Sequence, residues 1–206
     1  MIVSLSGIDG SGKTTRCQAL VRSLRERGVP ALSGKPAYEA NEAVKDFCEW
    51  AYGDRFAYFD QLNNEFYISC LVADWLSYLA RVLSKVGTTE ILICDRYVYD
   101  VLAQAIHMNA QAGVLRQLWH LFPRPDIDYW LEVSPEVAHE RLESRIELPM
   151  HRAESLDELR VLQRAYRQVA EQLDWKPVVV KDTTDTDDLA EEVEQTWQRI
   201  RMARAT

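Results

Sequence analysis

The sequence predicts an α/β fold in which a five-stranded parallel sheet is covered by helices on both faces. Three observations favour this fold. Short apolar segments recur along the 206 residues, segments with helical spacing separate them, and the first apolar segment runs directly into a glycine-rich loop. A single domain spanning residues 1–206 is the natural organisation for this length, and a hydrophobic content of 47% is sufficient for a substantial core.

Five strands and the helices between them follow in order. The run 90–94 is the clearest strand, because a continuously apolar segment is typical of a strand buried on both faces of a parallel sheet. Gly28 and Pro30 should end the first helix, and Ser134 with Pro135 should begin the helix after the fourth strand. The expected strands are residues 2–6, 31–33, 90–94, 127–133 and 178–180. Two expected helices begin at Thr14 and Pro135. The others cover about 39–50, 61–85, 98–122 with an interruption near 109–113, 156–173 and 187–201, and Gly87 should end the helix of residues 61–85.

Residues 7–14 form a phosphate-binding loop. They read Gly-Ile-Asp-Gly-Ser-Gly-Lys-Thr and satisfy the pattern G-x-x-x-x-G-K-[ST], between an apolar strand and a helix. Backbone N–H groups of such a loop surround anionic oxygens, and the positive end of the following helix favours negative charge. Lys13 should reach the β- and γ-phosphates of a nucleotide, and the hydroxyl of Thr14 is the expected Mg²⁺ ligand. The residues expected to bind the nucleotide are Gly7, Asp9, Gly10, Ser11, Gly12, Lys13, Thr14 and Thr15.

Asp95 and Arg96 follow the buried strand 90–94 directly. Because ligands bind beyond the carboxyl ends of parallel strands, both side chains should emerge beside the phosphate-binding loop. Asp95 would hold Mg²⁺ directly or through water, and Arg96 would bind an anionic group of the phosphate acceptor. The alternative is an ordinary surface salt bridge at the end of a strand.

Two predicted helices joined by an arginine-bearing segment indicate a mobile lid at about 141–158. Arg145 and Arg152 are the candidates for closing on the nucleotide, whereas Arg141 and Arg160 are interpreted as solvated charges.

Composition limits the partners and the compartment. A formal net charge of −8 argues against a nucleic-acid polymer or an anionic membrane as the main partner, because both favour a basic surface. No segment resembles a signal peptide, and no apolar run approaches the roughly 18 residues that a membrane span needs. The four cysteines, Cys17, Cys48, Cys70 and Cys94, show no paired framework and are expected to be buried free thiols. The sequence therefore favours a cytoplasmic protein in a reducing compartment.

Three segments resemble the thymidylate kinases, a family of P-loop nucleoside monophosphate kinases. Residues 6–15 resemble its phosphate-binding loop, residues 94–97 its Asp-Arg-Tyr motif, and residues 125–138 the strand and helix start that lead to its lid. The resemblance implies a three-layer P-loop kinase fold with a helical lid, ATP as donor, Mg²⁺, a nucleoside monophosphate acceptor such as dTMP, and commonly a homodimer. It also implies that Asp9 lies near the acceptor sugar, and that lid arginines, here Arg145 and Arg152, neutralise the transferring group.

The acceptor half departs from the family pattern. Residues 34–38 read Gly-Lys-Pro-Ala-Tyr where the family usually has Arg-Glu-Pro-Gly-Gly, and Ala73-Asp74-Trp75 stands where it has Ala-Asp-Arg. Leu71 stands where an aromatic ring stacks on thymine, and the serine and glutamine that follow the family's Asp-Arg-Tyr motif are out of register. The residues expected to bind the acceptor are Asp9, Lys35, Leu71, Trp75, Arg96, Asp100 and Gln104.

Three functions fit these residues. The first is ATP-dependent phosphorylation of a dTMP-like nucleoside monophosphate, with Lys13, Asp9, Arg96, Arg145 and Arg152 as catalytic residues, because phosphoryl transfer needs alignment and charge neutralisation. The second is a kinase of the same fold acting on a nucleoside, alcohol or amine, for which Asp9 is the natural base. The third is a nucleotide-dependent binding switch, against which stand the missing Asn-Lys-x-Asp signature and the arginine-bearing lid.

Overall fold

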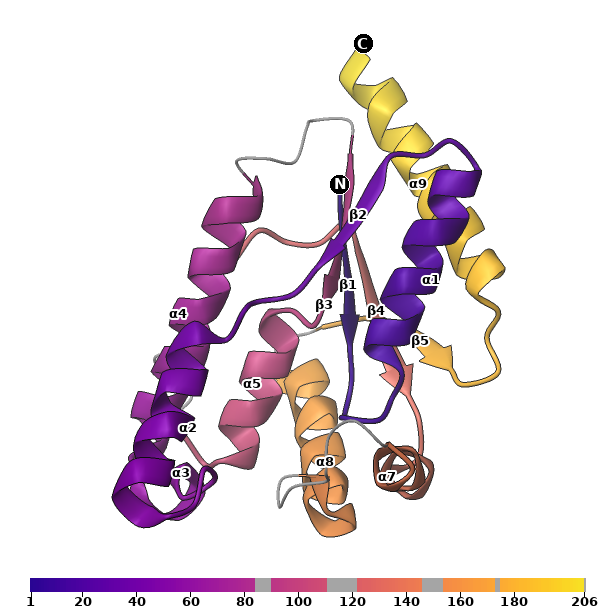
Figure 1. Cartoon of the computed structure of the whole chain (residues 1–206). Helices are drawn as coiled ribbons and strands as arrows, with labels where there is room; N and C mark the ends of the chain where they lie inside the picture. The colour runs from indigo at the N-terminus through magenta and orange to yellow at the C-terminus, as the bar shows by residue number, and fades with distance from the viewer. Residues whose placement is uncertain (84–89, 111–121, 146–153, 173–174, 206) are drawn as a thin grey trace.

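The computed structural model contains a five-stranded parallel sheet in the order β2-β3-β1-β4-β5 (Figure 1). The structure describes residues 1–83, 90–110, 122–145, 154–172 and 175–205. The strands are β1 (Ile2–Ser6), β2 (Ala31–Gly34), β3 (Ile91–Asp95), β4 (Ile127–Glu132) and β5 (Val178–Lys181). The α/β prediction is confirmed, and each strand lies within one residue of its predicted bounds. Since β1 occupies the centre, with Val3 opposite Ile93 in β3 and Ile127 in β4, the loop that follows β1 lies at the middle of one sheet edge.

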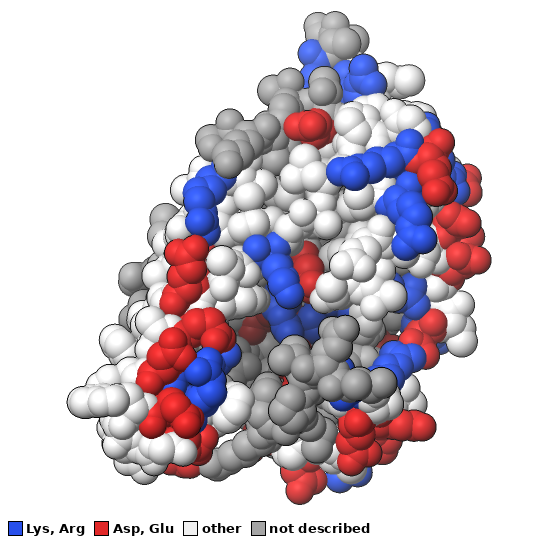
Figure 2. All heavy atoms as spheres, viewed as in Figure 1, with Lys and Arg blue, Asp and Glu red and all other residues white. Residues whose placement is uncertain are grey.

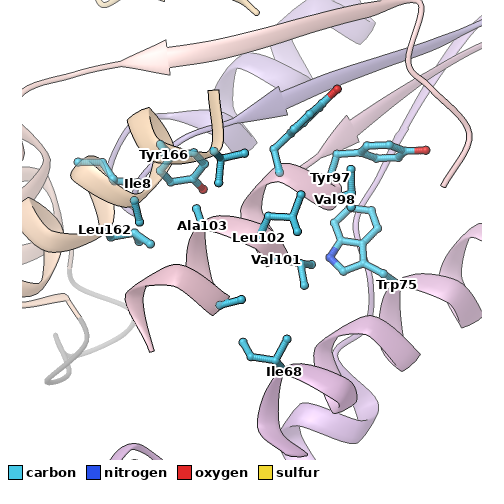
Figure 3. Packing of buried hydrophobic residues seen from close by; sticks show 14 of the residues in the cluster. Ile8, Ile68, Trp75, Tyr97, Val98, Val101, Leu102, Ala103, Leu162 and Tyr166 are labelled. Atoms are coloured by element: carbon cyan, nitrogen blue, oxygen red, sulfur yellow. The ribbon is translucent and has the colours of Figure 1, made fainter. Parts of the chain in front are cut away.

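Helices cover both faces of this sheet, as predicted (Figure 1). Helices α1 and α9 pack on one face, where Leu20, Ile93 and Trp197 share an apolar cluster. Helices α4, α5 and α8 pack on the other, where Trp75, Tyr97, Leu102 and Tyr166 share a second cluster (Figure 3). The helices are α1 (Lys13–Glu26), α2 (Glu39–Tyr52), α3 (Tyr58–Gln61), α4 (Asn64–Leu83), α5 (Val98–His107), α7 (Pro135–Glu143), α8 (Leu156–Gln172) and α9 (Thr186–Ala205).

The predicted helix signals at Gly28 and Ser134 are confirmed. Gly28 follows α1 with a φ of +76°, the left-handed conformation that glycine adopts without strain. The Ser134 side chain accepts a hydrogen bond from the Val137 backbone N–H at 3.2 Å, and Pro135 is the first residue of α7. The single helix predicted over 61–85 is wrong at its start. The extended backbone of Leu62 separates α3 from α4, and the side chain of Asn63 caps α4 by accepting from Phe66 N–H at 3.0 Å.

The predictions about apolar segments and about the cysteines need correction. Contrary to the first, α4 is long and apolar enough to cross a membrane by length and composition, with a mean hydropathy of 1.3 over its best window. It lies against α2 and α5 and buries Ile68, Trp75 and Leu79, as the core helix of a globular protein does. All four cysteines are free, but Cys70 is only partly buried. Gly87, which was expected to end α4, lies outside the described residues, as do residues 111–121.

Gly34, at the end of β2, lies too close to its neighbours for any side chain to fit there. A Cβ added there would lie 2.0 Å from the Tyr78 hydroxyl oxygen and 2.9 Å from Tyr78 Cζ. The Tyr78 ring is itself buried on α4 and cannot easily move aside. We therefore expect Gly34→Ala to lower the free energy of unfolding by about 1–3 kcal/mol, measured by denaturant titration.

Tyr78→Phe provides the control for this prediction, because it removes the nearest of the clashing atoms. Combined with Gly34→Ala, it should restore part of the lost stability. Equal stability of Gly34→Ala and the unchanged protein would contradict the packing argument.

Candidate functional site

The phosphate-binding loop is held in backbone conformations that suit glycine. Gly7, Gly10 and Gly12 have φ angles of +151°, +79° and +88°, where other residues are strained. The loop also packs tightly, because a Cβ on Gly10 would lie 2.3 Å from the carbonyl oxygen of Ala138 in α7. The glycines therefore allow the backbone to form a tight cradle at the end of β1.

The Lys13 ammonium lies inside this cradle. Its Nζ donates hydrogen bonds to the carbonyl oxygens of Gly7 and Ile8, both at 2.7 Å, and more weakly to Ser11 Oγ at 3.4 Å. The side chain is only 5% exposed. Burial, assisted by the nearby charge of Arg96, lowers the pKa of Lys13 to about 8. The positively charged Lys13 ammonium therefore lies at the centre of the loop that is expected to bind phosphate.

This lowered pKa predicts pH-dependent nucleotide binding. Above pH 8 the Lys13 amine loses its proton and no longer attracts phosphate, so we expect the Kd for Mg·ADP to rise about tenfold per pH unit well above that value. Calorimetric titration between about pH 7 and pH 9.5 measures this. Lys13→Met is the control, with weak binding that does not vary with Lys13 protonation. A constant Kd for the unchanged protein over this range would contradict the prediction.

Thr14 and Asp95 meet at the carboxyl edge of the sheet. Thr14 lies at the start of α1 and Asp95 at the end of β3. The Thr14 hydroxyl donates a hydrogen bond to Asp95 Oδ2 at 2.6 Å. Oxygen ligands of this kind suit Mg²⁺, which usually takes one or two protein ligands and completes its shell with phosphate and water. Within the described part of the chain, no three His, Cys, Asp or Glu residues gather as a metal cluster. The pair therefore fits a metal carried by a nucleotide rather than a dedicated protein cage.

Arg96 occupies the left-handed backbone region, with a φ of +78°. This conformation is strained for a residue with a side chain, and such strain persists only where surrounding contacts fix it. The guanidinium contacts the Asp9 carboxylate and lies 3.8 Å from Asp100 Oδ1. Burial opposes the charge, but the carboxylates of Asp9 and Asp100 raise the pKa of Arg96 well above its usual value. Arg96 and Asp9 thus form an ion pair beside the loop. In the view of Figure 2, basic and acidic side chains lie next to one another near the middle of the visible face of the molecule.

The acceptor residues predicted on α5 differ in accessibility. The Asp100 side chain turns inward, where Oδ2 accepts from Ser6 Oγ and the Tyr97 backbone N–H, both at 2.8 Å. Oδ1 lies 2.6 Å from the Tyr166 hydroxyl, and the residue is only 7% exposed. Gln104, one turn later, is half-buried. An acceptor contact for either residue stays a prediction.

The predicted acceptor residues on α4 belong to its packed face. Trp75 is 1% exposed and makes edge-to-face contacts with Tyr78 and Tyr97, at ring-centroid distances of 5.8 and 5.6 Å (Figure 3). Leu71 is half-buried against the same cluster. Where the family has an arginine, this chain therefore has a core side chain. Acceptor contacts for Trp75 and Leu71 stay predictions, as does one for Lys35, which is exposed after β2.

Tyr38 is a residue near this site that the sequence reasoning missed. It precedes α2 with a φ of +57°, a rare backbone conformation for tyrosine. Burial raises the pKa of its phenol, and the positive charge of Arg96 opposes this shift. The Asp74 carboxylate fixes the adjoining helix start by accepting from the backbone N–H groups of Ala40 at 2.8 Å and Asn41 at 3.0 Å. The unusual Gly-Lys-Pro-Ala-Tyr segment was the available signal.

The arginines expected at the lid have separate places. Arg145 pairs with the buried carboxylate of Glu154 at 2.9 Å, across the segment 146–153 that lies outside the described residues together with Arg152. Arg141 is exposed, as expected of a solvated charge, and its guanidinium also bonds both carboxylate oxygens of Asp182 at 2.8 Å and approaches Gly10 O at 3.4 Å. Arg160 is exposed and pairs with Glu136 and Asp157, as a solvated charge does.

A second group missed by the sequence reasoning connects α1 with the segment after β5. Arg16, one turn into α1, donates to the carbonyl oxygens of Thr184 at 2.8 Å and Asp182 at 2.9 Å. Because Arg141 binds the side chain of the same Asp182, two arginines hold residues 182–184 beside the phosphate-binding loop. Sequence spacing gave no signal for this contact, since the two arginines and the segment lie far apart in the chain.

Comparison with known proteins places this geometry in a family. The thymidylate kinase family model matches residues 5–193. The chain is 28% identical to a thymidylate kinase of Leptospira interrogans over 174 residues, which is 82% of this chain and 81% of that protein. It is 25% identical to a probable thymidylate kinase of Archaeoglobus fulgidus and 26% identical to one of Sulfolobus acidocaldarius. These matches cover 94% and 97% of this chain, and 92% and 95% of those proteins. The chain is therefore a P-loop kinase that belongs to the thymidylate kinase family.

Proposed function

We propose that this protein transfers the γ-phosphate of ATP to a nucleoside monophosphate of the dTMP type. The observation that carries the proposal is the meeting of three groups at the carboxyl edge of β1 and β3. These groups are the Lys13 ammonium in its loop, the Thr14–Asp95 pair, and the Asp9–Arg96 ion pair. The names of the relatives support the same acceptor class.

The residues divide the work of phosphoryl transfer. The loop N–H groups and Lys13 would bind the donor phosphates, and Thr14 and Asp95 would hold Mg²⁺. The metal ion supplies charge neutralisation on the β- and γ-phosphates when it is bound. Arg96 would bind the acceptor anion, while Asp9 accepts a hydrogen bond from the acceptor sugar. Arg145 and Arg152 are proposed to reach the transferring group from the lid. A phosphate acceptor needs no strong base, because it is already ionised at neutral pH.

The proposal includes a homodimer in the cytoplasm. Helix α4 supports the dimer, because Phe66, Leu76 and Leu83 are exposed apolar side chains on a helix that packs with its other face inward. A second copy of the chain would remove this apolar surface from water. Equilibrium ultracentrifugation tests the dimer, and a monomer at micromolar concentration would contradict it.

A different acceptor is the second candidate, and the position of Trp75 favours it. A core tryptophan on α4 supplies no charge for an acceptor phosphate. ATP consumption with Mg²⁺ should therefore be measured against dTMP, the other nucleoside monophosphates, nucleosides, and small amines and alcohols. Turnover of dTMP or a close analogue supports the proposed function. Turnover restricted to a nucleoside, amine or alcohol would replace it with the second candidate.

A further inference from the structure

The Tyr166 hydroxyl lies between two acceptors from different parts of the site. It is 2.9 Å from the carbonyl oxygen of Gly7 in the phosphate-binding loop and 2.6 Å from Asp100 Oδ1 on α5. A backbone carbonyl oxygen and a carboxylate oxygen only accept hydrogen bonds, and a phenol has one hydrogen to donate. Burial raises the pKa of Tyr166 well above its usual value, so the phenol keeps that hydrogen at neutral pH. The hydroxyl can therefore make one full hydrogen bond at a time.

Each of these two acceptors also has one cationic side chain nearby. Gly7 O also accepts from Lys13 Nζ at 2.7 Å, and Asp100 Oδ1 lies 3.8 Å from Arg96 Nη1, which is beyond hydrogen-bond length. Arg96 instead bonds Asp9 through its other terminal nitrogen. Hydrogen bonds therefore connect Lys13 through Gly7 and Tyr166 to Asp100, and Arg96 lies next to Asp100 at 3.8 Å. Tyr166 is 1% exposed, beside Ile8 and Ala103 in the core, so water does not replace these contacts (Figure 3).

We propose that Tyr166 is a positioning residue that couples the occupancy of the donor loop to the orientation of Arg96. When Lys13 turns to donor phosphate, Gly7 O loses one donor and draws the Tyr166 hydrogen toward itself. The hydrogen stays on the phenol oxygen and only its direction changes. Asp100 Oδ1 then lacks a donor in a buried site and attracts Arg96 Nη1, which loosens Arg96 from Asp9. Donor binding thus prepares the acceptor side. This inference rests on the proposed function for the identity of the acceptor.

The first test needs no acceptor. In ¹⁵N-labelled protein, the Arg96 side-chain NMR signals are followed while Mg·ADP is added, because ADP has no γ-phosphate to perturb Arg96 directly. We expect these signals to shift in the unchanged protein and to shift by less than half as much in Tyr166→Phe. The matched control is Tyr129→Phe, which removes another buried phenol that donates to a carboxylate, Glu192 at 2.8 Å, on the opposite face of the sheet. This control should keep the full shift.

The second test measures the affinity for dTMP with and without saturating Mg·ADP. We expect Mg·ADP to tighten dTMP binding about fivefold in the unchanged protein and in Tyr129→Phe, and to leave it nearly unchanged in Tyr166→Phe. A purely structural role would lower the stability of both variants without this difference in coupling. Equal Arg96 responses in the unchanged protein and Tyr166→Phe, or none in the unchanged protein, would overturn the proposal. Failure of dTMP to bind would overturn the acceptor assignment, while the Arg96 signals would still decide the coupling.

Discussion

Replacing Lys13 with methionine is expected to lower kcat/KM for ATP-dependent phosphotransfer about a thousandfold. The reason is electrostatic, because removal of one preorganised donor to the charge that develops in a transition state costs about 10²–10³ in rate, and here a full positive charge is lost. Lys13 is the cation that lies inside the loop, where its ammonium contacts the carbonyl oxygens of Gly7 and Ile8. Methionine keeps the length of the side chain and removes the charge. Steady-state kinetics at saturating Mg²⁺ measures the effect.

Lys45→Met is the control for this prediction. Lys45 is a lysine on α2 that pairs with Glu42 at 2.6 Å on the surface, away from the loop, so its loss should change kcat/KM by less than about twofold. Thermal unfolding of both variants separates loss of charge from loss of fold. Phosphotransfer by Lys13→Met within tenfold of the unchanged protein would refute the assignment of the donor site.

Gly10→Ala is expected to weaken Mg·ADP binding at least about tenfold and to destabilise the fold by about 2–4 kcal/mol. Two costs add here. The left-handed φ of +79° costs a residue with a Cβ about 1–2 kcal/mol, and the Cβ would lie 2.3 Å from Ala138 O, so that α7 or the loop must shift. A shift of the loop moves the N–H groups that are proposed to bind phosphate. Calorimetry and denaturant titration measure the two effects.

Gly28→Ala separates these two costs. Gly28 has a φ of +76°, close to that of Gly10, but no atom lies within 4 Å of its added Cβ, and it follows the far end of α1. It should therefore show only the conformational cost of about 1–2 kcal/mol and unchanged Mg·ADP affinity. If Gly10→Ala and Gly28→Ala destabilise the protein equally, the contact between the loop and α7 has no energetic importance.

Local patterns predicted the sheet and the donor loop, while convergence between distant residues escaped them. The strand of residues 91–95, the glycine loop and the Ser134 cap each depend on a few neighbouring residues, so their spacing is sufficient. The predicted start of α4 was wrong because the helix begins only after the cap at Asn63, and residue spacing does not locate that boundary among the mostly polar residues 60–65. Tyr166 and Gly7 are 159 residues apart, and no spacing rule brings them together. The inward turn of Asp100 depends on the hydroxyls of Tyr166 and Ser6, which lie 66 and 94 residues away in the sequence.

The acceptor half shows the same limit in another form. Trp75 was placed in the acceptor site because of its position relative to the family motif, but helical periodicity also places it with Ile68 and Leu79 on the buried face of α4. Sequence position alone could not decide between the two. Tyr38 escaped notice because residue type does not reveal its left-handed backbone, and the unusual segment 34–38 was the available signal. Rebuilt segments are therefore the least predictable part of the site.

The central place of β1 also determines when the nucleotide site can form during synthesis. During synthesis β1 has no neighbouring strand until β3 and β4 have been made. The residues of β3 and β4 that pair with β1 lie about 90 and 125 positions further along the chain. Until then the loop has neither Asp95 beside Thr14 nor α7 against Gly10. A nascent chain that ends before β4 therefore presents the complete phosphate-binding motif without a binding site. The site is therefore complete only after α7, which ends at Glu143, has been made.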